Sequence, residues 1–204
     1  LPEDVTIIWA DDNFGYMKRL SGPQEQKRAG RAGVYYHLSY LGVPHSYLWF
    51  STTPPALMYE ELRKAYDTTA DCIWLANCGD LKGSEVQVSF FLDMAYDIEQ
   101  FNEKNVHTYP ARWLAKMFGE QYYNTLEDIT CSHINLAFSR KPEYMGWGYW
   151  NNYWGGGEKR TDTEFSFTNY EEAGKRLAEY RRIGKKAEDM LVTLEEAARP
   201  ALYQ

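Results

Sequence analysis

The sequence predicts an α/β fold in which parallel strands are joined by crossovers and a helical region follows. Three apolar, β-branched or aromatic runs carry this prediction, and they cover residues 5–10, 34–37 and 72–77. The first run is apolar on both faces, which is typical of a strand buried in a parallel sheet. The chain has 204 residues, of which 44% are apolar, so it is long enough for one large domain or two small ones with a real core.

The segments between these runs are crossovers, so the strands are expected to be parallel. Only a short helix or an irregular loop fits between the first and second runs. Between the second and third runs we expect a loop rich in aromatic residues and then a helix from about Pro55 to Thr69. Proline is tolerated at the start of a helix, because the first helical N–H groups have no partner in any case.

Three strands alone would leave both sheet edges bare, and folded proteins avoid such edges. A complete (β/α)8 barrel usually needs about 250 residues. The three strands are therefore expected to belong to a larger barrel or sheet. The predicted fold class is α/β: a partial (β/α)8 TIM barrel, represented by its last strands, followed by an α-helical bundle. We place the C-terminal part of the barrel in residues 1–101 and the bundle in residues 102–204.

The second half of the chain has mainly helical patterns. Helices are predicted over 85–96, 110–118, 121–138 and 169–191. Ser84 is the expected cap of the first of these and Gly119 the expected end of the second, while Thr168-x-x-Glu171 is typical of a capping box. The segment 144–157 alternates glycine with aromatic residues, and we favour a structural plug there over a sugar-stacking surface.

Composition excludes several partners. The net charge of −7 argues against nucleic acid, since phosphate binding needs a basic face. No apolar run approaches the roughly 20 residues of a membrane span. The cysteines have no metal-ligand spacing, and no cofactor is implied. Aromatic residues make up 16% of the chain, which suits a carbohydrate site and a well-packed interior equally.

Polar side chains follow each predicted strand. Asp11, Asp12 and Asn13 end the first, His37 ends the second, and Asn77 ends the third. The carboxyl ends of parallel strands meet at the edge where α/β folds bind ligands. A carboxylate, an imidazole and an amide around one cavity fit hydrolysis by an activated water. Because side chains alternate along a strand, only one of the two aspartates is expected to face the cavity, and the other would brace the loop or cap a backbone N–H.

Two alternatives stay open from the residues alone. Asp11, Asp12, His37 and Asp80 could ligate a divalent ion, although one histidine with carboxylates is thin evidence for a metal site. The chain could also be a barrel remnant that binds glycan without cleaving it. A serine nucleophile is not expected, since no Gly-x-Ser-x-Gly motif is present.

Several ordered motifs resemble glycoside hydrolase family 115, the α-glucuronidases. They are the segments 9–16, 31–37, 44–49, 73–82, 90–95 and 165–173. The resemblance implies a TIM barrel followed by a helical bundle, with further domains at both ends. It implies that the whole protein is an inverting glycosidase that releases (4-O-methyl)glucuronic acid from glucuronoxylan side chains, without a metal. The isolated segment would then be inactive.

The resemblance also implies roles for particular residues. The implied catalytic residues are Asp11, Asp12 and Asn77, and the implied substrate-binding residues are Asn13, Tyr36, His37, Trp49 and Asp80. A second catalytic group is expected outside this chain. The implied partners are plant cell-wall glucuronoxylan and the remaining domains of a longer chain, with a homodimer left open. We expect a secreted or periplasmic protein.

Overall fold

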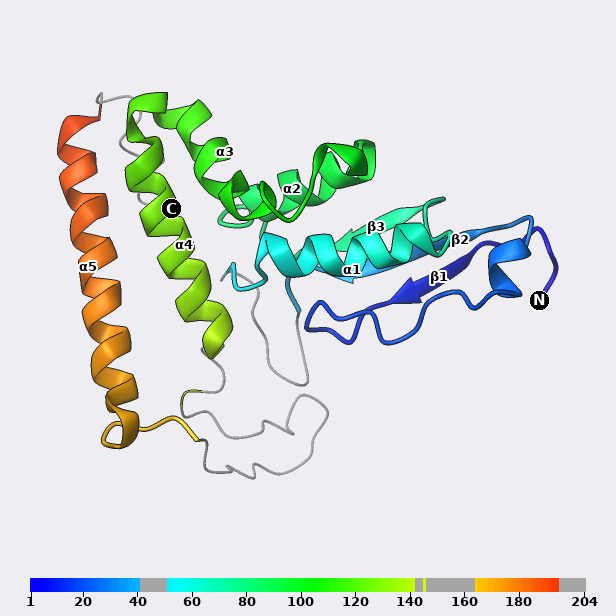
Figure 1. Ribbon diagram of the computed structural model, residues 1–204, viewed down its shortest axis with the longest axis horizontal. Helices are drawn as coiled ribbons and strands as arrows, with labels where there is room; N and C mark the ends of the chain where they lie inside the picture. Colours follow the sequence, from blue (N-terminus) through cyan, green and yellow to red (C-terminus); the bar gives the residue numbers. More distant parts are fainter. Residues whose placement is uncertain (41–50, 142–144, 146–163, 195–204) are drawn as a thin grey trace. The chain divides into compact units, whose positions relative to one another are not determined.

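The computed structural model describes residues 1–40, 51–141, 145 and 164–194 (Figure 1). These residues form two compact units, the first running to Val106 and the second beginning at His107. The division into domains 1–101 and 102–204 stays a prediction. Among the described residues, no helix is both long and apolar enough to cross a bilayer.

The first unit is built on a three-stranded parallel sheet. Its strands are β1 (Ile7–Ala10), β2 (Ala32–His37) and β3 (Trp74–Asn77), in the order β1-β2-β3. The predicted parallel arrangement is confirmed. The register places Ala10 beside Tyr35 and His37 beside Asn77, so the carboxyl ends of the strands lie at one edge of the sheet.

Two α-helices of the first unit run beside this sheet (Figure 1). They are α1 (Pro55–Asp67) and α2 (Glu85–Tyr96), and the short 3-10 turns η1 (Glu25–Lys27) and η2 (Ile98–Gln100) complete the unit. Phe91 of α2 packs on Tyr36 and Trp74, with ring centroids 6.3 and 5.7 Å apart. Ser84 is the N-cap residue of α2, as predicted, but its side chain makes no capping hydrogen bond. The carboxylate of Glu85 instead accepts from the backbone N–H of Gly83 at 2.7 Å.

Burial differs between the two faces of the sheet. On one face, Val34 and Tyr36 of the central strand are fully buried. On the other face, Ile8 is 38% exposed and Leu75 46% exposed. The expectation that β1 is buried on both faces is therefore wrong within this chain, because β1 and β3 are edge strands and α1 and α2 do not cover this second face.

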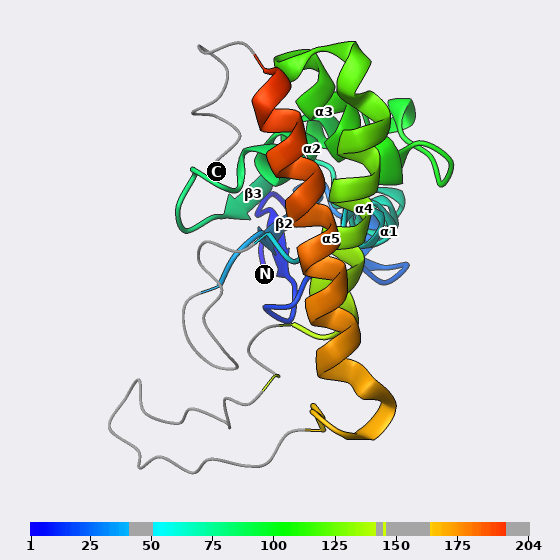
Figure 2. The same cartoon turned by 90° about the vertical axis from the view of Figure 1, so that its left-hand side faces the viewer.

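The second unit is helical. Its helices are α3 (Tyr109–Phe118), α4 (Tyr123–Ser139) and α5 (Glu172–Thr193), with 3-10 turns η3 (Val106–Thr108), η4 (Glu120–Tyr122) and η6 (Asn169–Glu171). Helices α4 and α5 run side by side (Figure 2). As predicted, α3 ends at Gly119, which has a φ of 120°.

The predicted capping box before α5 is wrong. Thr168 makes no side-chain capping bond. Tyr170 and Glu171 both adopt left-handed backbone conformations, with φ of 60° and 54°, so the helix proper begins only at Glu172. The hydroxyl of Ser166 takes over part of the capping role, since it accepts from the N–H of Asn169 at 2.7 Å.

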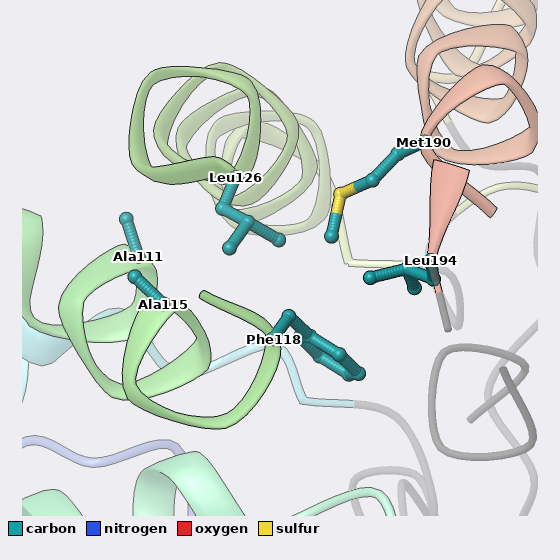
Figure 3. Packing of buried hydrophobic residues seen from close by; sticks show 6 residues of the cluster. All are labelled: Ala111, Ala115, Phe118, Leu126, Met190 and Leu194. Carbon is teal, nitrogen blue, oxygen red and sulfur yellow. The ribbon is translucent and has the colours of Figure 1, made fainter. Parts of the chain in front are cut away.

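The core of the second unit joins the three helices (Figure 3). Its buried residues are Ala111, Ala115 and Phe118 of α3, Leu126 of α4, Met190 of α5, and Leu194 just beyond α5. An ion-pair network also links α4 to α5: Asp128 accepts from Arg182 at 2.5 Å and pairs with Lys186. Packing and ion pairs thus hold these helices in one unit.

Candidate active site

The loop after β1 carries the first two candidate residues, and hydrogen bonds to the loop itself hold both. Asp11 is buried, and one carboxylate oxygen accepts from the N–H of Gly15 at 2.8 Å. The other oxygen pairs with Nδ1 of His37 at the end of β2. The Asp11 carboxylate therefore joins two strand ends and has no exposed side-chain surface.

Asp12 is hydrogen-bonded to later residues of the same loop. Its Oδ1 accepts from the N–H groups of Phe14 and Tyr16 at 3.0 and 3.1 Å. Its Oδ2 lies 3.0 Å from Nζ of Lys18, and 22% of its side chain is exposed. Both carboxylates thus meet backbone N–H donors of the loop, and the expectation that only one of the two aspartates faces a cavity stays a prediction.

This turn depends on two left-handed residues. Asn13 has a φ of 70° and Gly15 a φ of 91°. Asparagine and glycine are the residues that adopt this conformation most readily. The Asp-Asp-Asn-Phe-Gly segment therefore folds into a compact loop at the carboxyl edge of the sheet rather than continuing the strand.

Tyr36 supports this loop from the buried side. Its hydroxyl donates to the carbonyl of Gly15 at 2.9 Å, and its ring stacks on Phe91. The residue is 0% exposed. In this geometry Tyr36 has no surface for a substrate, so its surroundings favour a role in holding the loop over the predicted role in binding.

His37 is buried between aromatic rings. The rings of Tyr35 and Tyr40 meet it edge-on at 4.8 and 5.0 Å. Because a carboxylate can only accept, the pair with Asp11 favours a proton on Nδ1, which leaves Nε2 as the nitrogen that can accept a proton. Asp11 and His37 are thus two predicted site residues in direct contact.

Asn77 ends β3 and lies beside His37 in the sheet register. Its amide donates to the hydroxyl of Tyr35 at 2.6 Å. Asp80 is exposed in the turn that follows β3. Trp49 lies outside the described residues. The structure thus gathers Asp11, Asp12 and His37 around one loop and brings Asn77 to the neighbouring strand end.

Two residues near this edge were missed by sequence reasoning. Tyr35 receives the amide of Asn77, and Glu61 of α1 accepts from the backbone N–H of Met17 at 2.9 Å. The signal for Glu61 was available, because a carboxylate on the apolar face of a predicted helix needs a partner. No sequence signal pointed to Tyr35, because aromatic residues are common throughout the chain.

The described ranges contain no group of three or more His, Cys, Asp or Glu side chains arranged to hold a metal ion. Asp11, Asp12, His37 and Asp80 therefore do not form the ligand set that the metal-dependent alternative requires. That alternative gains no support from this part of the chain.

Comparison with known proteins gives the family. The model of glycosyl hydrolase family 115 matches residues 1–144. No curated protein matches the chain. A solved structure, described as a novel family GH115 4-O-methyl-α-glucuronidase, BtGH115A, with specificity for decorated arabinogalactans, is similar to the whole chain with 32% identity and a TM-score of 0.88. The similarity covers 26% of that structure, so the chain spans about a quarter of its length. The chain belongs to glycosyl hydrolase family 115.

Proposed function

We propose that this chain supplies part of the active site of an inverting α-glucuronidase, which releases (4-O-methyl)glucuronic acid from glycan side chains. The observation that carries the proposal is the Asp11–His37 pair, held by the loop after β1 at the carboxyl edge of a parallel sheet. This edge is where α/β folds bind ligands. Membership of a glycosidase family supports the same reaction class.

The fold supports the proposal because one face of the sheet is left uncovered by α1 and α2. Two apolar side chains of this sheet face, those of Ile8 and Leu75, are exposed within this chain. We propose that β1, β2 and β3 are the last strands of a TIM barrel whose other strands cover this face, and that the three-helix unit is the bundle that follows. A barrel without its other strands cannot enclose a sugar, so the isolated segment would be inactive.

The two aspartates support different roles. Each oxygen of the Asp11 carboxylate has a partner, Gly15 or His37, and none of its side chain is exposed, so we propose that it acts through the imidazole. Asp12 is the aspartate with exposed side-chain surface, which makes it the candidate for contact with the substrate or the water. Inverting glycosidases use two carboxyl groups about 6.5–9.5 Å apart, and the second would come from outside this chain.

The remaining residues complete the proposed site. Asn77 is proposed as a catalytic-site amide, and Asn13, His37, Trp49 and Asp80 as substrate contacts. Tyr36 is proposed only as a support of the loop, since it is fully buried. We propose glucuronoxylan as the substrate and a secreted or periplasmic location, with the remaining domains as partners and a homodimer as an alternative assembly. The specificity of BtGH115A for decorated arabinogalactans supports a second substrate to test.

The test uses the full-length protein that carries this segment. We expect it to release glucuronic acid from glucuronoxylan or a glucuronic-acid-decorated arabinogalactan, with and without EDTA, and to form the β-anomer first, as NMR would show. Loss of activity with EDTA would favour a metal-dependent hydrolase. Affinity for either glycan without turnover would favour a binding protein.

Substitutions test the site itself. Asp11→Asn and Asp12→Asn are expected to lower kcat by different orders of magnitude if one of them is the acid or base. Asp67→Asn on α1 is the matched control, since Asp67 is exposed and pairs with Arg63 of its own helix. Equal, mild losses for both site variants would count against a catalytic role for either aspartate.

A further inference from the structure

Glu61 is a buried carboxylate that the function proposed above does not use. It lies on the face of α1 that also carries Met58, Leu62 and Ala65, and it is only 5% exposed. Burying a carboxylate is costly unless it is paired and hydrogen-bonded. Both oxygens of Glu61 have partners: Oε1 accepts from Nζ of Lys64 at 2.7 Å, and Oε2 accepts from the backbone N–H of Met17 at 2.9 Å.

The bond to Met17 joins α1 to the end of the candidate active-site loop. Met17 follows Tyr16, and Tyr16 is bonded to Asp12 in both directions. The N–H of Asp12 donates to the carbonyl of Tyr16 at 3.0 Å, and the N–H of Tyr16 donates to Oδ1 of Asp12 at 3.1 Å. The backbone position of Met17 therefore fixes the position of Tyr16. The hydrogen bonds of Tyr16 in turn hold the Asp12 carboxylate in place.

The beginning of the loop is held separately. Asp11 and Gly15 are fixed by His37 and Tyr36 of β2. Glu61 adds a hydrogen bond from α1 to the end of the loop, and the segment around Asp12 would lose this bond without it. Met17 would also lose the acceptor of its N–H, which is costly in a partly buried setting.

We propose that Glu61 is a positioning residue of the candidate active site, which holds the Asp12 carboxylate in place through the backbone of Met17 and Tyr16. The inference rests on the proposed function, since it assigns Glu61 to the same reaction. A charged acceptor suits this task, because hydrogen bonds to an ionised group are roughly twice as strong as neutral ones. Lys64 compensates the buried charge from the helix surface.

Glu61→Leu separates positioning from folding. Leucine continues the apolar face of α1, and Lys64, whose side chain is 47% exposed, stays solvated when its partner is removed. The same change removes the acceptor of the Met17 N–H. We expect Glu61→Leu in the full-length protein to stay folded at the assay temperature but to lose about 10²-fold in kcat, the scale expected when a reacting group is displaced by about 1 Å. We expect little change in KM, since the other substrate contacts are untouched.

Two further variants make the readout specific. Glutamine has the same side-chain length as glutamate and keeps an acceptor oxygen. Glu61→Gln is therefore expected to retain most of the kcat that Glu61→Leu loses. Glu60→Leu is the matched control, because Glu60 is the exposed neighbour on the same helix and lies 3.9 Å from the same Lys64. We expect Glu60→Leu to leave kcat unchanged. Hydrogen exchange of the amides of residues 12–17 should become faster in Glu61→Leu only.

The possible outcomes separate this inference from the proposed function. A wild-type protein that releases no glucuronic acid from either glycan would overturn the proposed function and, with it, the role of Glu61 in the reaction. An active wild-type protein with normal kcat in Glu61→Leu would overturn the role of Glu61 alone. So would a Gln variant as poor as the Leu variant, or a loss of activity that only follows the fraction of unfolded protein.

Discussion

Gly15 and Tyr36 are expected to be energetically coupled. Gly15 has a φ of 91°, and a Cβ added there would lie 2.7 Å from the hydroxyl oxygen of Tyr36. That hydroxyl cannot move away easily, because the ring is fully buried against Phe91 and the hydroxyl donates to the carbonyl of Gly15 itself. Gly15→Ala therefore strains the backbone and also pushes a buried donor away from its acceptor.

The magnitude follows from these contacts. A left-handed conformation costs a residue with a Cβ about 1–2 kcal/mol. Overpacking a buried contact adds about 1–3 kcal/mol. We therefore expect Gly15→Ala to lower the free energy of local opening of the loop by about 2–5 kcal/mol. Tyr36→Phe leaves the carbonyl of Gly15 without its buried donor, which is expected to cost about 1–3 kcal/mol.

The double variant is the decisive measurement. Once Phe replaces Tyr36, the methyl group introduced by Gly15→Ala no longer meets a hydroxyl. The combined loss should then be smaller than the sum of the single losses by about 0.5–3 kcal/mol, the range found for residues in contact. Gly22→Ala is the control for the glycine change, because Gly22 has no left-handed φ and its nearest atom would be 3.6 Å away.

Hydrogen exchange measures this prediction in the full-length protein. The amides of residues 12–17 report the free energy of local opening of the loop, apart from the stability of other regions. Additive losses in the double variant would refute the reasoning, since they would mean that the methyl group and the hydroxyl do not compete for the same space. A Gly15→Ala loss no larger than that of Gly22→Ala would refute the backbone argument.

Three predictions concern the helical unit. Gly184→Ala on α5 should raise the free energy of unfolding of the helical unit by about 1 kcal/mol, because a Cβ there meets no atom within 4 Å and alanine is the better helix former. Chemical denaturation measures this change, and a lower free energy of unfolding would contradict the prediction. Leu126→Ala should lower the same quantity by about 2–5 kcal/mol, since Leu126 lies at the centre of the core joining α3, α4 and α5 (Figure 3); a change below about 1 kcal/mol would mean that the core collapses around the gap. Arg182 and then Lys186 hold the pKa of Asp128 well below its usual range, so the Asp128 carboxylate stabilises the folded unit above its unfolded pKa and loses this contribution as pH falls toward its folded pKa. Melting temperatures at falling pH should drop less in Asp128→Asn than in the wild type, and parallel curves would count against this network.

Several features of the fold could be predicted from local sequence. The apolar runs predicted β1, β2 and β3 and their parallel order, because crossovers between buried strands allow little else. Pro55 marked the beginning of α1 and Gly119 the end of α3, since these residue types fix or free the backbone by themselves. The polar side chains at the strand ends could also be predicted from the sequence, because they directly follow the apolar runs.

Only the tertiary structure decided how those residues are used. Both Asp11 and Asp12 bind loop N–H groups, because the turn at Asn13 and Gly15 brings the backbone back over them. Tyr36 was predicted as a pocket residue, but the helix layer buries it beneath the loop.

The remaining differences have the same origin. The sequence before α5 matches a capping box. Tyr170 and Glu171 nevertheless adopt left-handed conformations, and Thr168 makes no side-chain capping hydrogen bond. Glu61 meets Met17 across 44 positions of the chain, a contact that no local pattern encodes. Local propensity and hydrophobic pattern act over a few residues and are written in the sequence, whereas the partner of a buried polar group is chosen by how distant segments pack.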